Sequence, residues 1–137
     1  MPTLFYVFTI FISVLLLLHP SKAGFHIVGK EWEPVDQTVY NPAVYLRFNL
    51  KQIEGEGGCN KFQCSYEIDQ ELKTLQIGRV GKTVKECDEN NDLDKEKHFV
   101  QALRNAETYE LDDSEVFSRL TLIDAKGLVT LELIEME

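Results

Sequence analysis

Apolar and polar residues alternate along several short segments of the chain, which predicts a fold built mainly from strands. The clearest alternation covers residues 44–51, whose apolar face carries Val44, Leu46, Phe48 and Leu50. A period of two indicates a strand with one buried face and one exposed face. Other segments are of the same kind, and we expect further strands at residues 30–35, 64–68, 72–77, 108–111, 120–123 and 128–134.

One segment has the longer period of a helix. Its apolar residues recur with the spacing i, i+3, i+4 and i+7 at Phe99, Ala102, Leu103 and Ala106. This spacing predicts one α-helix over about residues 93–106, with a single apolar stripe that faces a core.

Glycines mark the connections between the expected elements. The glycine-rich residues 55–58 follow the strand at 44–51, and glycine permits backbone angles that are closed to other residues. We therefore expect a turn or a bulge there. This run lacks the frame of a phosphate-binding loop, and Glu56 within it would repel a phosphate. Gly127 lies where a hairpin loop needs a left-handed residue.

The N-terminus predicts export. Residues 4–18 form an apolar stretch that is shorter than the roughly 20 residues of a spanning helix. Ser21 and Ala23 fit the small-x-small pattern of signal peptidase sites, which predicts a signal peptide at 1–23 and cleavage after Ala23. One secreted or periplasmic domain, residues 24–137, then remains. No Lys or Arg precedes the apolar stretch, so an uncleaved membrane anchor is the alternative.

The charge of the chain argues against some partners. Its 14 Lys and Arg and 23 Asp and Glu give a formal net charge of −9. An acidic protein repels phosphate backbones and anionic lipid heads, so we expect no nucleic-acid partner. No later apolar stretch approaches membrane length, and we expect no stable membrane span once the signal is cleaved.

Three cysteines carry the remaining chemistry. Paired cysteines in a small exported domain indicate a disulfide, and the residues alone leave three pairings open among Cys59, Cys64 and Cys87. If Cys64 is the free thiol, it could link two chains into a disulfide-bonded dimer. A thiol-dependent enzyme would need a base beside Cys64, and neither His26 nor His98 lies in a recognisable frame.

No frame for a metal or a cofactor is found. Zinc needs four ligands, which three scattered cysteines do not supply. The charge-rich run at 88–97 fails the calcium-loop pattern, because Leu93 and Phe99 stand where Gly and Glu are required. We therefore expect no metal site, no cofactor and no catalytic residue.

From about Trp32 to Ile134 the chain resembles the META domain, or HslJ-like, family. The residues that carry the resemblance are Gly58-Cys59-Asn60, Phe62, Tyr66, Thr83, Cys87, Glu96, Phe99, Leu103, Tyr109, Leu120, Leu122 and Gly127. It is the order of the whole set that is specific. Two positions depart from the family pattern: Cys64 replaces a usual glycine, and Glu86 replaces a small or apolar residue.

The resemblance implies properties that the patterns do not show. It implies an α+β fold, a strongly bent, barrel-like antiparallel sheet with one helix, and a disulfide between Cys59 and Cys87. It also implies a small exported protein with no established catalytic residue. We expect a non-enzymatic domain with a protein partner and a stress- or virulence-associated role at the cell envelope or outside the cell. The alternative is a module for a small apolar ligand, with Trp32, Phe48 and Phe62 forming a pocket or the core.

Overall fold

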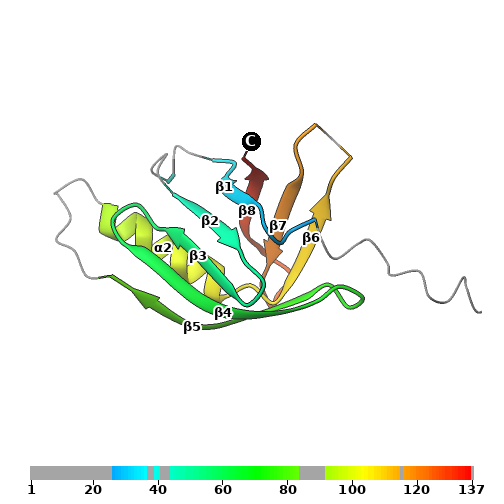
Figure 1. Cartoon of the computed structure of the whole chain (residues 1–137), viewed down its shortest axis with the longest axis horizontal. Helices are drawn as coiled ribbons and strands as arrows, with labels where there is room; N and C mark the ends of the chain where they lie inside the picture. The colour runs from blue at the N-terminus through cyan, green and yellow to red at the C-terminus, as the bar shows by residue number, and fades with distance from the viewer. Residues whose placement is uncertain (1–25, 37–38, 41–43, 84–91, 115, 137) are drawn as a thin grey trace, which may run out of the picture.

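The computed structural model describes residues 26–36, 39–40, 44–83, 92–114 and 116–136. Within these ranges, eight antiparallel strands follow one another in chain order and close into a ring, and one helix packs against them (Figure 1). This confirms the α+β class and the bent, barrel-like sheet. The elements are β1 Glu31–Pro34, β2 Tyr45–Phe48, β3 Gln52–Glu56, β4 Lys61–Asp69, β5 Thr74–Lys82, α2 Asp92–Arg104, β6 Thr108–Asp112, β7 Arg119–Ile123 and β8 Val129–Glu135.

The core lies inside the ring, where the apolar face of each strand points. Trp32 and Phe48 are fully buried there, and Phe62 is 3% exposed. Trp32 also donates a hydrogen bond of 3.3 Å from Nε1 to the carbonyl oxygen of Ile27. The three residues expected to line a pocket or form the core are therefore core residues, packed against other side chains.

Helix α2 covers the interior with the stripe that its spacing predicts. Phe99 and Leu103 are fully buried, and the Phe99 ring lies 5.9 Å from the ring of Phe62 on β4. No helix in the described ranges is long and apolar enough to span a bilayer. The expected signal peptide at 1–23 lies outside the described residues and stays a prediction.

The expected turn at the glycine-rich segment is confirmed in part. Strand β3 includes Gly55 and ends at Glu56, and the turn to β4 follows, with Gly58 at a φ of +113°. The connection from β2 to β3 is a separate tight turn at 49–51, where Leu50 is 85% exposed. Leu50 is thus not on the buried face. The position of Gly55 within β3 requires glycine, because a side chain would not fit. An added Cβ would stand 2.2 Å from the carbonyl oxygen of Tyr45 and 2.8 Å from the Phe62 ring.

Strand β5 is also longer than predicted, and a bulge allows its extension. Cys64 pairs with Val80 and Tyr66 pairs with Ile77, so two residues of β5 stand opposite Ser65. Gly78 is one of the two, and a Cβ there would lie 2.2 Å from Ser65 Oγ. The hairpin between β7 and β8 forms as predicted, with Gly127 at a φ of +81°.

Candidate functional site

The ring of strands has one weak seam, between β5 and β6. These strands pair at a single register position, Thr74 opposite Thr108, and the seam ends with a hydrogen bond of 2.9 Å from Leu75 N to Glu107 O. Beyond this point β5 runs on to Lys82 with β4 as its only paired strand in the described part of the chain. The other edge of β5 therefore has no paired strand among the described residues, and we call it the open edge.

The phase of the ladder shows which backbone groups face this open edge. Thr83 N donates to Lys61 O at 3.0 Å, which makes Lys82 and Phe62 a non-hydrogen-bonded pair. The N–H and C=O groups of Lys82 therefore point away from β4. By the same alternation, the N–H and C=O groups of Val80 also point away from β4. Leu75 N donates to Glu107 on the side away from β4, so the backbone groups of Ile77, two residues further on, face that side as well.

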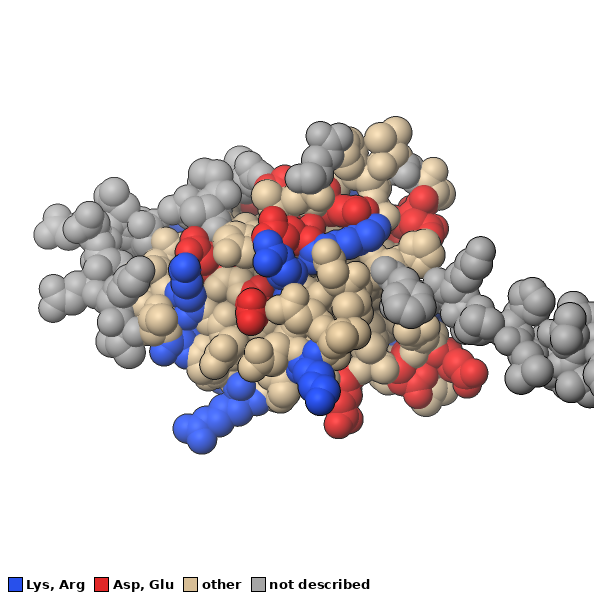
Figure 2. Space-filling model, viewed as in Figure 1, with Lys and Arg blue, Asp and Glu red and all other residues tan. Residues whose placement is uncertain are grey.

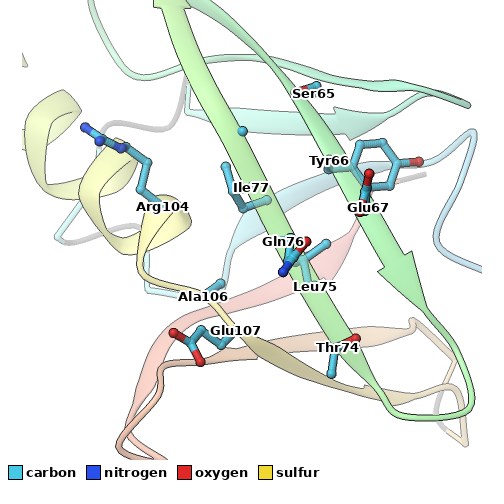
Figure 3. Close-up of a pocket in the computed structure, with 11 residues that line it drawn as sticks. Ser65, Tyr66, Glu67, Thr74, Leu75, Gln76, Ile77, Arg104, Ala106 and Glu107 are labelled. Carbon is cyan, nitrogen blue, oxygen red and sulfur yellow. The ribbon is translucent and has the colours of Figure 1, made fainter.

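A cavity of about 710 Å³ opens beside this edge. Figure 3 shows Gln76 and Ile77 of β5 on one side of it, and Arg104 and Glu107, at and after the end of α2, on the other. Glu67 of β4 also lines it, so this cavity carries charges of both signs.

A second cavity of about 450 Å³ lies further along β5 and shares Arg104 with the first. We call the two together the α2–β5 groove. The second cavity is lined by Val80, Lys82, Lys97, His98, Val100, Gln101 and Arg104. No carboxylate is among these described lining residues, so this half of the groove is basic.

The basic half stands out on a chain with a net charge of −9. Figure 2 shows Lys and Arg side chains along the lower left of the face that is drawn, where β5 ends, and further Lys and Arg side chains in its upper centre, beside Asp and Glu.

A buried polar cluster positions the helix that forms one wall of the groove. Asn60 donates from Nδ2 to Glu96 Oε2 at 3.0 Å, and Thr83 Oγ1 donates to Asn60 Oδ1 at 3.2 Å. Glu96 is fully buried, and a Cβ on Gly57 would lie 2.5 Å from its Cγ. The family motif residues Asn60, Thr83 and Glu96 therefore join α2, β5 and the start of β4. These three residues are linked to one another by hydrogen bonds through Asn60. The second carboxyl oxygen, Glu96 Oε1, has no hydrogen-bond partner among the described residues.

The described cysteines differ in state. Cys64 is a free thiol that is 2% exposed, whereas Cys59 is not free. Cys87 lies outside the described residues, so its pairing with Cys59 stays a prediction. The buried thiol of Cys64 has no access to a second chain, which argues against the expected disulfide-linked dimer. Burial also raises the pKa of Cys64 to about 11, the opposite of what a catalytic thiolate needs.

The described residues contain no cluster of three His, Cys, Asp or Glu that could hold a metal. The groove itself was not found by sequence reasoning. Two signals for it were present: β5 carries Arg79 and Lys82 without any acidic residue, and Lys97 and Arg104 are spaced two turns apart on the helix. What the sequence does not show is that an open strand edge lies beside them.

Comparison with solved structures supports the fold. An NMR structure of a protein from Burkholderia xenovorans superposes with a TM-score of 0.62 at 16% identity, covering 80% of this chain and 83% of that one. A crystal structure of a DUF4847 family protein from Bacteroides vulgatus gives 0.54 at 18% identity, covering 69% and 60%. No curated protein matches the chain. The family model described as META domain matches residues 26–135, and the chain therefore belongs to the META domain family.

Proposed function

We propose that this protein is a non-enzymatic binding domain that acts in the periplasm, at the cell envelope or in secreted form, and holds a protein partner in the α2–β5 groove. The observation that carries the proposal is the open edge of β5, where the backbone groups of Ile77, Val80 and Lys82 face a groove instead of a strand. Backbone groups of this kind are bound by other polypeptides in strand-addition complexes.

The absence of catalysis is part of the proposal and rests on the chemistry of Cys64. Its thiol is closed in the core with a raised pKa, so it offers no nucleophile to a substrate. The small-ligand alternative has weaker support, because Trp32, Phe48 and Phe62 are packed within the buried core cluster.

The export part of the proposal rests on the N-terminal sequence. An apolar stretch followed by Ser21 and Ala23 predicts cleavage after Ala23. A stress- or virulence-associated role, as the family resemblance implies, fits a partner met outside the cytosol. Mass spectrometry of the exported protein tests this part, because the mature chain should begin at Gly24.

The binding part is tested by crosslinking and affinity capture of the full-length chain, expressed with its own N-terminus and a C-terminal tag. We expect the wild type to recover a specific protein from the envelope or secreted fraction. The double variant K82E/K97E, which reverses two exposed charges of the groove, should lose it. The control K126E changes an exposed lysine in the β7–β8 hairpin and should retain it. Failure to capture any partner, or capture that the groove variant does not affect, would contradict the proposal.

A further inference from the structure

We propose that the α2–β5 groove binds an extended polypeptide segment that carries apolar and acidic residues on the same face, and that this segment adds to β5 as a further strand. This rests on the proposed function and narrows it to one class of partner.

The backbone of β5 supplies the template. Three residues, Ile77, Val80 and Lys82, present N–H and C=O groups toward the groove, and no other strand of the described residues pairs with them on that side. A row of unpaired groups on a strand edge favours pairing with another extended chain. A helical partner would leave these donors and acceptors without ordered partners, so the groove favours a strand.

The floor of the groove is apolar. Ile77 and Val80 are half-buried and pack against the core, and Val100 of α2 is 7% exposed. A strand added beside β5 would direct every second side chain toward this floor, because side chains alternate between the two faces of a sheet. The inward positions of the partner beside Ile77 and Val80 are therefore expected to be apolar.

The rim selects the charge of the remaining inward positions, because Lys82 pairs with the buried Phe62 and so lies on the same face of β5 as Val80. Lys82, Lys97, His98 and Arg104 line the second cavity without a carboxylate, and side chains of Asp or Glu would form charge-assisted hydrogen bonds with them. Lys97 and Arg104 lie about 10 Å apart along the helix axis, a distance that three residues of an extended strand cover. A segment of about four to six residues is long enough to meet both.

The two ends of the groove are not equivalent. Glu67 and Glu107 line the first cavity together with Arg104. Carboxylates of a partner would be repelled at that end, so its acidic residues belong beside Lys82 and Lys97. Near Gln76 we expect neutral polar residues instead.

The same charges argue against a second copy of this chain as the occupant. Pairing two β5 edges would bring Arg79 and Lys82 of one copy close to the same residues of the other, and like charges across a strand pair are destabilising. Lysines on an edge strand are a common means of preventing such self-association. An acidic partner would convert this repulsion into attraction.

The test uses the exported protein purified from an expression host and synthetic octapeptides. Every second residue of the probe, on one face of the strand, is glutamate in one half and valine in the other, and the positions between them are glutamine. One control peptide has lysine in place of glutamate, and a second has N-methyl groups on alternate backbone nitrogens, which blocks strand pairing. We expect the probe to perturb the backbone amide signals of Ile77, Val80 and Lys82 and to slow their hydrogen exchange. Neither control peptide should do so.

Protein variants complete the test. K82E/K97E should weaken binding of the probe at least tenfold, and K126E should leave it unchanged. Absence of binding, equal binding of the lysine peptide, perturbation confined to another surface, or a dimer that forms through β5 would each overturn the inference. If affinity capture yields a groove-dependent partner whose bound segment is helical or basic, the proposed function stands and this inference falls.

Discussion

Asn60, directly before β4, donates a hydrogen bond of 3.0 Å to the fully buried carboxylate of Glu96 on α2. The amide oxygen of Asn60 in turn accepts from Thr83, just beyond β5. One asparagine thus connects the helix to both strands of the β4–β5 pair. Because α2 forms a wall of the groove, this contact links the family motif to the geometry of the candidate site.

Replacing Glu96 should destabilise the fold. Glu96→Ala removes the hydrogen bond from the buried amide of Asn60 to Glu96 and opens a cavity, and we expect the free energy of unfolding to fall by about 2–4 kcal/mol. Glu96→Gln keeps an acceptor oxygen and removes a buried charge, so it should cost less than alanine. Chemical denaturation measures both, with Glu110→Ala on the exposed face of β6 as a control of small effect. Equal losses for alanine and glutamine would show that the charge itself, and not the hydrogen bond, is required.

Gly57 should be required because of its contact with Glu96. A methyl group at Gly57 would stand 2.5 Å from Glu96 Cγ, whereas a methyl group at Gly81 meets nothing closer than 3.9 Å. We expect Gly57→Ala to lower the free energy of unfolding by about 1–3 kcal/mol and Gly81→Ala to have a much smaller effect. The loss at Gly57 should shrink when Glu96 is also alanine, because the clashing atoms are then absent. A loss that persists in the double variant would show that the backbone, and not the clash, explains it.

The sequence predicts elements whose signal is local and fails where pairing is not local. The stripe of Phe99 and Leu103 predicted α2, and a single left-handed glycine at Gly127 predicted the last hairpin. The alternation through Phe48 was extended too far, to the exposed Leu50, because a period of two does not show where a strand ends and a turn begins.

The candidate site was missed for the same reason. A pattern of apolar and polar residues indicates that one face of β5 is buried, but it carries no information on whether its edge is paired. The pairing of β5 with β6 at Thr74 ends with the hydrogen bond from Leu75 to Glu107. Glu107 belongs to the short connection between α2 and β6, so the path of this connection determines how far the two strands pair. The burial of Glu96 likewise departs from the rule that charged residues stay exposed, and only the family pattern singled out that position.

Cys64 should make stability depend on alkaline pH. Its pKa is about 11 in the folded protein, against 9.0 for an ordinary cysteine, so the folded state holds the thiol proton more tightly than the unfolded state. This contribution is complete below pH 9 and is lost as the pH rises from 9 to 11. Between pH 8 and pH 10 the wild type should lose about 1 kcal/mol more than Cys64→Ala.

The comparison with Cys64→Ala isolates this effect. Burial also raises the pKa of Tyr40, Tyr66 and Tyr109, and these tyrosines act in the same direction in both proteins. Denaturant midpoints at the two pH values measure the difference. Equal pH dependence of the two proteins would show that the thiol titrates near its ordinary value. Rapid alkylation of the native protein would then place Cys64 at the surface.

A disulfide between Cys59 and Cys87 should stabilise the domain. A bond between them closes a loop of about 28 residues, which in the entropy model constrains the unfolded chain by roughly 3–4 kcal/mol. The double variant C59A/C87A should therefore unfold at a clearly lower denaturant concentration, although the polar cluster beside Cys59 remains. A peptide map of the exported protein without reductant should recover both cysteines in one linked fragment and Cys64 as a free thiol. A fragment that links Cys64 to either partner would require its release from the core between β3 and β5, and would overturn both the pairing and the packing that surround it.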